Sequence, residues 1–359
     1  MSKIKVNSLE GVGASTPAIS IDNTSGACAA NITSLNGGQF SNRNVIINGA
    51  CQVAQRSNLT TAQAGYGAVD RFSVVSGGAS RFTLSKGDGP GAQYGLPSAL
   101  KFTTTTADNA GDATDYMYLD TRLEGQDMQR FQKGSSDAKQ YTLQFWIKLA
   151  IQGTYVVQLF DVDNSRHVVA NYTVSTPNTW EKKIITFPAD TSGTLDNDNA
   201  KSFEVRWHFM GGSNYRSGTQ QTTWGSIVAG NMLAGMGNAV SATGDNFITG
   251  MQLEVGSVAT DFEHRSFGQE LALCQRYFQK YTGVANRIYI VNVYRVQHPL
   301  PVQMRANPTV TKSYGTSTNL ATDNTSAYTK SLNWDLQYTG AGSGIIDIIS
   351  GTLTLDAEI

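Results

Sequence analysis

Apolar and polar side chains alternate with a period of two through the middle of the chain, and this alternation limits the possible folds more than any other feature. The clearest example is residues 141–149, whose apolar positions are Tyr141, Leu143, Phe145, Ile147 and Leu149. Successive side chains of a strand point to opposite faces of a sheet, so the pattern predicts a strand with one buried face. The same alternation recurs at residues 155–162, 167–174, 180–187, 203–209 and 247–255.

Turn-forming residues separate these segments. Asp163, Asn164 and Ser165 follow one of them, and a run rich in Asp, Asn and Gly covers residues 190–199. Many short strands divided by such turns predict an all-β fold, a two-sheet jelly-roll β-sandwich over residues 44–265. A short helix is expected at residues 126–132. Three tryptophans at alternating positions are expected in cores: Trp180, Trp207 and Trp334.

A different period appears at residues 266–281. Apolar side chains recur there at spacings of four and three, which predicts one seam along a helix. The seam consists of Phe267, Leu271, Cys274, Phe278 and Tyr281. Ser266 and Gln269 form a capping box at its start. The seam covers about two heptads, whereas a coiled coil is assigned from roughly three to four. It therefore predicts either an oligomerisation helix between copies of the chain or a helix that packs on its own domain.

The segments on either side of the sandwich differ from it. Residues 1–43 carry too few apolar side chains to build a core, so we expect an extended N-terminal arm that is ordered only against a partner. A docking arm and a flexible terminus both fit this composition. Residues 266–282 are expected to be a connecting helix, and residues 283–359 a small C-terminal β-domain. So short a domain would gain stability from a shared interface.

Composition excludes several classes of function. The formal net charge is −1 and no cluster of Lys and Arg occurs, so we expect no nucleic-acid partner. No apolar run approaches the roughly 20 residues that cross a bilayer, and the first residues lack the apolar core of a secretory signal. We therefore expect that the chain is made in a cytosol and does not insert into a membrane. Cys28, Cys51 and Cys274 are far apart, which argues against a disulfide framework or a zinc site. No metal and no cofactor are expected.

Aromatic side chains on polar strand faces are the first candidates for a binding site. Trp146 shares a face with Gln144 and Lys148, away from Phe145. Sugar rings stack on indole or phenol rings while polar neighbours bind their hydroxyls, so a glycan site needs this mixture. Two other strands present comparable polar faces, with Tyr116, Tyr118, Asp120 and Arg122 on one and Glu204, Arg206 and His208 on the other.

These three strands would form one polar-aromatic surface if they shared a sheet. Such a surface fits a glycan, and it equally fits a subunit interface or structural packing, where Trp, Tyr and Arg are also common. Trp224, in a loop-like stretch near Tyr215 and Arg216, is a second candidate contact, with local packing as the alternative.

Acidic pairs raise the possibility of an enzyme. Glycosidases use two carboxylates roughly 5 to 9.5 Å apart, and Asp161 with Asp163 or Asp120 with Glu124 would supply such a pair. Asp161 and Asp163 lie next to turn residues, however, where carboxylates commonly accept hydrogen bonds from backbone amides. Calcium binding by Asp161, Asp163 and Asn164 is disfavoured because the other positions of a calcium loop are missing. We therefore expect no catalytic residues.

A series of short motifs resembles the structural proteins of tailed bacteriophages, particularly tail-fibre proteins of phages that infect marine bacteria. Together the motifs extend over the sandwich and the helix. They are NVIING (44–49), VAQR (53–56), DRF (70–72), RLEG (122–125), LQFWIK (143–148), NTWEKK (178–183) with FP (187–188), GMQLEVG (250–256), FEHR (262–265) and ELALCQRY (270–277).

This resemblance implies a carbohydrate-binding-module-like jelly roll in a virion appendage, usually a homotrimer, that helps attach the particle to host surface polysaccharide. Residues 3–10 are similar to the virion-proximal ends of such fibres, so residues 1–43 would dock onto other virion tail proteins. Residues 300–305 with 308–310 resemble a distal β-domain. The expected location is the virion tail, assembled in the host cytoplasm.

The chain lacks the repetitive shaft of a long fibre. It could therefore be the main fibre, a side fibre, or an adaptor between tail parts. The alternative function is a structural tail adaptor or decoration protein without receptor binding, and a polysaccharide depolymerase is the less favoured enzyme alternative.

Overall fold

The computed structural model describes residues 41–59, 65–78, 82–108, 112–291, 293–313, 316–318, 320–338 and 343–359. It also places three short strands, β1 (Ser8–Leu9), β2 (Ile19–Ile21) and β3 (Cys28–Ala30), which pair with one another. Apart from these strands, residues 1–40 of the predicted docking arm lie outside the described residues.

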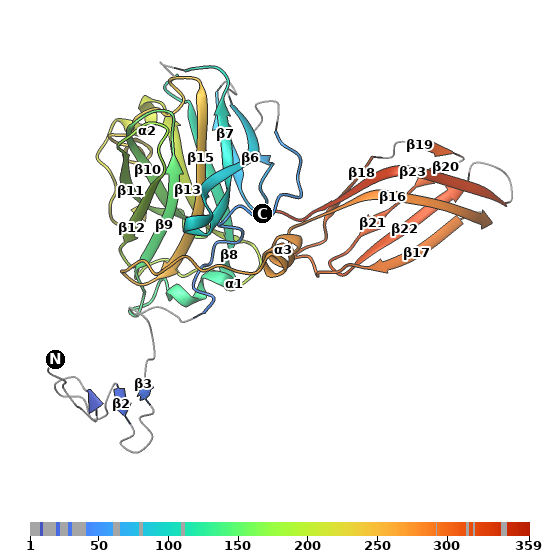
Figure 1. Ribbon diagram of the computed structural model, residues 1–359, viewed down its shortest axis with the longest axis horizontal. Helices are drawn as coiled ribbons and strands as arrows, with labels where there is room; N and C mark the ends of the chain where they lie inside the picture. The colour runs from blue at the N-terminus through green and yellow to red at the C-terminus, as the bar shows by residue number, and fades with distance from the viewer. Residues whose placement is uncertain are drawn as a thin grey trace.

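The main body is a jelly-roll β-sandwich of two antiparallel sheets, as the alternation predicted (Figure 1). The seven-stranded sheet has the order β14-β11-β10-β13-β8-β5-β4. Its strands are β14 (Gly225–Ser226), β11 (Arg166–Val174), β10 (Gly153–Asp161), β13 (Lys201–Gly211), β8 (Tyr116–Glu124), β5 (Ser73–Gly77) and β4 (Gly65–Tyr66). The five-stranded sheet runs through β12 (Glu181–Phe187), β9 (Tyr141–Lys148), β15 (Gly244–Val255), β7 (Leu96–Thr104) and β6 (Phe82–Gly91).

The alternating apolar residues form the core between the two sheets. Tyr141, Leu143, Phe145 and Ile147 of β9 are fully buried, and Trp207 of β13 is buried opposite them. The Phe145 and Trp207 ring centroids lie 6.0 Å apart in an edge-on arrangement. Burying each side chain of this size contributes about 1.5–3 kcal/mol to stability. Because the alternation puts these side chains on the inner face of each sheet, their burial holds the two sheets together as layers.

Short helical segments lie in the connections between the strands of the sandwich. The helix predicted at residues 126–132 is present as α1 (Gly125–Met128) followed by the 3-10 turn η2 (Gln129–Phe131). The others are η1 (Ala92–Tyr94), α2 (Ser213–Arg216) and η3 (Ala229–Asn231). None of the helices within the described residues is long and apolar enough to cross a membrane.

The helix predicted for residues 266–281 is shorter than expected. It is α3 (Phe267–Gln275), and Ser266 caps it with the predicted capping box. Phe278 and Tyr281 belong instead to β16 (Phe278–Val291), where Phe278 pairs with Asp356. Strand hydrogen bonds to this partner replace the helical ones, so the predicted five-residue seam is wrong.

The part of the seam that remains helical packs mainly on its own chain. Cys274 is buried in a small cluster with Ile47, Val53 and Tyr277, and Leu271 packs against that cluster. Phe267 points outward and is 57% exposed. Cys51 and Cys274 are both free and buried. The homotrimer remains a prediction.

A smaller β-domain follows α3 and lies beside the sandwich (Figure 1). One of its sheets joins β16, β23 (Ser343–Asp356) and β18 (Thr309–Ser313), with β19 (Thr316–Thr318) paired to β23. The other joins β17 (Val293–Pro299), β22 (Ser331–Tyr338) and β20 (Leu320–Asp323), with β21 (Ser326–Ala327) paired to β22. Trp334 lies on β22, and its side chain is outside the described residues. The domain's buried cluster includes Met304, Leu336, Leu353 and Leu355.

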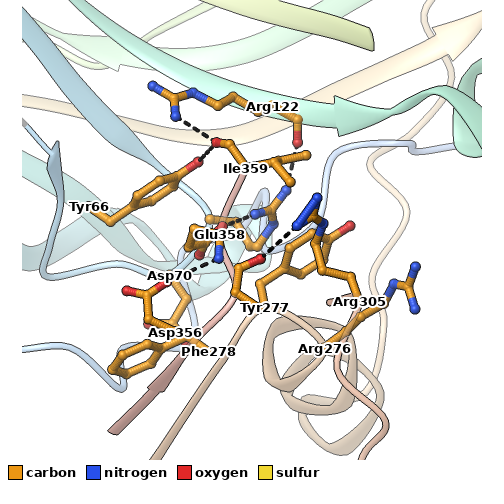
Figure 2. Close-up of polar contacts among 12 residues, drawn as sticks. Tyr66, Asp70, Arg122, Arg276, Tyr277, Phe278, Arg305, Asp356, Glu358 and Ile359 are labelled. Atoms are coloured by element: carbon orange, nitrogen blue, oxygen red, sulfur yellow. Dashed lines mark hydrogen bonds and ion pairs between the residues drawn. The ribbon is translucent and has the colours of Figure 1, made fainter. Parts of the chain in front are cut away.

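The last four residues, 356–359, lead from the small domain to the sandwich: Asp356 ends β23 and Ala357 belongs to the small domain's buried cluster, whereas Glu358 and Ile359 contact the sandwich. We call them the tail segment. Figure 2 shows Glu358 and Ile359 between side chains of the sandwich. Arg56 binds Asp356 at 2.8 Å, and Glu358 pairs with Arg71. The Tyr66 hydroxyl donates to the carbonyl of Ile359 at 2.9 Å. The small domain thus gains a shared interface through charge pairs, of which the pair between Arg71 and Glu358 is buried.

Candidate functional site

The structure separates the three strands that the sequence offered as one surface. β8 and β13 are neighbours in the seven-stranded sheet, where Tyr118 pairs with His208. β9, which carries Gln144 and Trp146, belongs to the five-stranded sheet. The condition for a single surface over all three strands is therefore not met, because the two sheets turn their polar faces to opposite sides of the sandwich.

A cavity of about 230 Å³ lies on the outer face of the seven-stranded sheet. We call it the tyrosine pocket. Its lining consists of Tyr116, Tyr118, Arg206, His208, Tyr215, Met232 and Leu233. The strand period points the first four outward, whereas α2 and the segment after η3 supply the others. The Leu233 amide donates to the Tyr215 carbonyl at 2.9 Å, which joins the two loop segments into one wall.

Aromatic rings shape this pocket. The Tyr116 and Tyr118 rings are stacked with centroids 6.0 Å apart and planes 20° from parallel. Tyr215 meets Tyr116 edge-on at 5.8 Å, and the His208 ring lies 5.0 Å from Tyr118. Phenol rings in this arrangement offer apolar faces next to polar edges, a combination that suits amphipathic rings.

A chain of buried hydrogen bonds sets the state of His208. The side-chain oxygen Oε1 of Gln158 lies 3.0 Å from His208 Nε2, and the side-chain nitrogen Nε2 of Gln158 lies 2.8 Å from His167 Nδ1. The amide oxygen only accepts and the amide nitrogen only donates, so neutral His208 carries its proton on Nε2. His167 then donates from its own Nε2 to Gln221 Oε1 at 2.9 Å.

His208 is held neutral with an unused acceptor. Burial, reinforced by the charge of Arg206 and by His167, lowers the pKa of His208 well below its ordinary value. Its Nδ1 has no hydrogen-bond partner among the residues that the structure describes. An unsatisfied buried acceptor costs about 1–3 kcal/mol, which a bound donor such as a hydroxyl would offset.

Arg206 lines the pocket, and an acidic side chain and two aromatic rings hold its guanidinium in place. Glu204 binds it at 2.5 Å, and its guanidinium lies 4.2 Å from the Phe160 ring centroid and 5.0 Å from that of Tyr118. Burial alone would raise the pKa of Glu204, but Arg206 and Lys201 outweigh it and lower that pKa. The ion pair keeps the rim of the pocket close to neutral.

Arg122 faces the same side of the sheet but contacts the tail segment. It binds Asp120 at 3.0 Å and donates to the Ile359 carbonyl at 2.6 Å. Glu124 is buried and binds Arg276 and the Tyr277 hydroxyl, each at 2.7 Å. The Asp120–Glu124 pair is thus engaged in contacts within the chain.

The other acidic pair belongs to a turn, which favours the structural interpretation of that motif. Asp161 is fully buried, forms an ion pair with Lys133 and accepts from the Asn164 amide at 3.0 Å. Asp163 accepts from the Asp196 amide at 3.0 Å. Among the described residues, no group of three or more His, Cys, Asp and Glu side chains suits a metal ion.

Two tryptophans have local packing roles. The Trp224 indole donates to the Pro188 carbonyl at 2.8 Å, and its ring lies 5.8 Å from that of Tyr141, so local packing is the interpretation that the geometry favours. Trp180 is half-buried against Phe247 rather than in the core, where Trp207 lies.

Gln144 and Trp146 line a separate cavity of about 280 Å³ on the outer face of the five-stranded sheet. We call it the tryptophan pocket. The sequence pattern does not predict Tyr94 and His264 here, nor Gln158 and Met232 at the tyrosine pocket. These residues come from turns or from the polar face of a strand far away in sequence, and no local period marks them.

No protein-family model matches the sequence, and no curated protein matches it. Several solved structures are similar. One is the enzymatically active domain of tailspike protein 4 of bacteriophage CBA120, at 10% identity and a TM-score of 0.32. That match covers 59% of this chain and only 21% of the phage chain.

Two carbohydrate-binding modules are matched over nearly their whole length. The family 11 module from Clostridium thermocellum, solved with a mixed-linked tetrasaccharide, is 14% identical with a TM-score of 0.29, over 58% of this chain and 100% of the module. TmCBM61, solved with β-1,4-galactotriose, is 10% identical with a TM-score of 0.31, over 59% and 99%. At this level of similarity, ligands and activities do not transfer to this chain.

Proposed function

We propose that the chain is a non-catalytic, glycan-binding protein whose tyrosine pocket receives the sugar. The observation that carries this proposal is the stacked pair Tyr116 and Tyr118 beside neutral, buried His208 with its unused Nδ1. A sugar presents C–H faces that stack on phenol rings and hydroxyls that donate to such an acceptor. The near-neutral rim formed by Arg206 and Glu204 suits an uncharged glycan.

The proposal of binding without catalysis is supported by the contacts of the acidic side chains that the sequence offered as catalytic pairs. Asp120, Glu124 and Asp161 each engage a basic partner within the chain. A glycosidase needs two carboxyl groups that face the scissile bond, one of them able to donate a proton. These three carboxylates are used instead to hold the fold together.

The proposed place of action is the tail of a bacteriophage, as a fibre-like component that helps the particle attach to its host. The ordered series of motifs that resembles tail-fibre proteins supports this part of the proposal. Assembly as a homotrimer would multiply weak sugar contacts by avidity, without requiring a stronger single site. Cryo-electron microscopy of an intact virion tests the location, and an adaptor would appear enclosed by other tail proteins.

The binding function is tested on a glycan array with wild type and Tyr118→Ala. Losing one stacked ring should weaken binding about tenfold, which corresponds to about 1.4 kcal/mol. Tyr328→Ala is the matched control, because Tyr328 is 51% exposed in the small β-domain. Equal binding by wild type and a folded Tyr118→Ala variant would exclude the tyrosine pocket. Release of reducing sugar by the wild type would contradict the non-catalytic assignment.

A further inference from the structure

The five-stranded sheet carries an aromatic pocket of its own, on the opposite side of the sandwich from the tyrosine pocket. The Trp146 and Tyr94 ring centroids are 4.6 Å apart with planes at 43°. Tyr94 is 50% exposed on the short turn η1, and Trp146 is half-buried on β9. The cavity beside them is also lined by Gln144, Lys182 and His264.

The backbone under Trp146 is specialised to let its ring lie against the sheet. Trp146 stands between Lys182 of β12 and Thr249 of β15. The register then shifts at Gly250, which has a positive φ of 62°. A Cβ at this position would lie 3.0 Å from Trp146 Cδ1 and 2.8 Å from Leu96 Cδ1. Glycine is needed here for both the left-handed backbone and the close approach of the indole.

A buried polar atom marks the same pocket. The side chain of Gln144 is 1% exposed, and its Nε2 donates to the Thr260 carbonyl at 2.7 Å. This bond orients the amide, and Gln144 Oε1 has no hydrogen-bond partner within the described part of the chain. An amide oxygen accepts hydrogen bonds only, so the pocket combines an aromatic platform with an acceptor for a hydroxyl.

Charge narrows the class of ligand. The charged side chains that line the pocket are Lys182 and Asp261, one of each sign. They give no net attraction for an acidic or a basic ligand, in contrast to sites for phosphate or uronate, which gather cations. The apolar ring faces, the single oriented acceptor and this balance of charge together fit an uncharged sugar.

From this geometry we infer that the tryptophan pocket is a second glycan site, selective for neutral hexose units and independent of the tyrosine pocket. The inference rests on the proposed function for the kind of ligand but not for the location. The two pockets open on opposite outer faces, so they engage separate stretches of glycan. Each sandwich is then bivalent, and it can cross-link a polysaccharide layer or gain avidity within it.

The test uses short ligands that cannot bridge the two pockets. Trisaccharides of glucose, galactose and mannose, with trigalacturonate as the charged comparison, are titrated by calorimetry and by tryptophan emission. The proteins are the full chain, Tyr118→Ala, Tyr94→Ala, Trp146→Ala and the double variant Tyr118→Ala/Tyr94→Ala. Tyr94 is half-exposed, so its truncation leaves the core intact, and Tyr328→Ala is again the control.

The expected result is that Tyr118→Ala still binds one neutral trisaccharide per chain, with a change in tryptophan emission. Adding Tyr94→Ala should weaken this binding about tenfold, and Trp146→Ala should also remove the change in emission. If Tyr118→Ala abolishes all binding while Tyr94→Ala and Trp146→Ala retain it, the second site is refuted and the proposed function stands.

The opposite pattern, full binding by Tyr118→Ala and none by Tyr94→Ala, supports the tryptophan pocket and refutes the tyrosine pocket. Binding of trigalacturonate in place of the neutral trisaccharides refutes the assigned ligand class. Absence of binding by every protein, wild type included, refutes both sites.

Discussion

The ion pair between Arg71 and Glu358 should determine how firmly the tail segment holds the small β-domain on the sandwich. The side chain of Arg71 is 1% exposed and that of Glu358 is 6% exposed, so both charges are largely removed from water. Glu358→Ala leaves the Arg71 guanidinium buried, with a hydrogen bond to the Arg122 carbonyl at 2.6 Å and the Tyr277 ring at 3.4 Å as its remaining contacts. Removing one partner of such a pair costs about 3–5 kcal/mol.

We therefore expect Glu358→Ala to lower the free energy of unfolding by about 3 kcal/mol in urea titrations followed by tryptophan fluorescence, with unchanged strand content by circular dichroism. The double variant Arg71→Met/Glu358→Leu should be less destabilised than Glu358→Ala, because it removes the buried guanidinium together with its partner, while Arg56, which also pairs with Glu358, keeps its ion pair with Asp356. Lys330→Ala, at an exposed position of the small domain, is the control. A loss below about 1 kcal/mol for Glu358→Ala, or a double variant that is worse than the single one, would refute this account of the interface.

Three further predictions concern the core, the helix and His208. Phe145→Ala removes a fully buried ring and should cost about 3–5 kcal/mol in the same urea titration; a cost near zero would contradict its central position in the core. Ser266→Ala removes the capping box of α3 and should cost about 1 kcal/mol, whereas Ser266→Asp should retain most of the stability. His208 has a depressed pKa in the folded state, so the unfolded chain takes up its proton first and stability falls as the pH drops below about 6.5, by up to about 1.4 kcal/mol per pH unit. His208→Gln should remove that part of the slope between pH 6.5 and 5, and an unchanged slope in thermal melts would show that His208 is not held neutral.

The sequence predicts the sandwich well because a strand with one buried face alternates apolar and polar residues, and this alternation can be read directly from the sequence. Each alternating segment that it marked lies in a strand of the structure apart from at most one terminal residue, as residues 141–149 do in β9 and residues 203–209 in β13. The helix at residue 266 was over-extended for a physical reason. Phe278 and Tyr281 fit a helical spacing, but β23, more than 60 residues later, pairs with them as strand residues. Local spacing contains no information about such a distant partner.

The candidate site was predicted only in part for the same reason. Alternation correctly put Tyr116, Tyr118 and His208 on the polar side of their strands, but it could not say which strands share a sheet. Trp146 was consequently grouped with side chains that lie on the other side of the sandwich. The loop residues that complete each pocket, Tyr215 and Tyr94, depend on turn geometry and have no periodic signal.

One face of the seven-stranded sheet carries both the tyrosine pocket and the contact with the tail segment, and the order of its polar residues explains how. Along β8, outward positions run from Tyr116 and Tyr118 to Asp120 and Arg122. The Arg122 end is in contact with the tail segment, because Arg122 binds Asp120 and donates to the Ile359 carbonyl. The tyrosine end stays open beside α2. Because strand neighbours on a face are two residues apart, substitutions at the pocket and at the interface touch adjacent side chains, and Asp120 lies between them.

Burial, reinforced by Glu204, raises the pKa of Asp120 to about 6 against the opposing charge of Arg122. Asp120 therefore changes its charge next to both the pocket and the interface. Because Arg122 opposes the rise in the pKa of Asp120, replacing Arg122 should affect the pocket and the interface together.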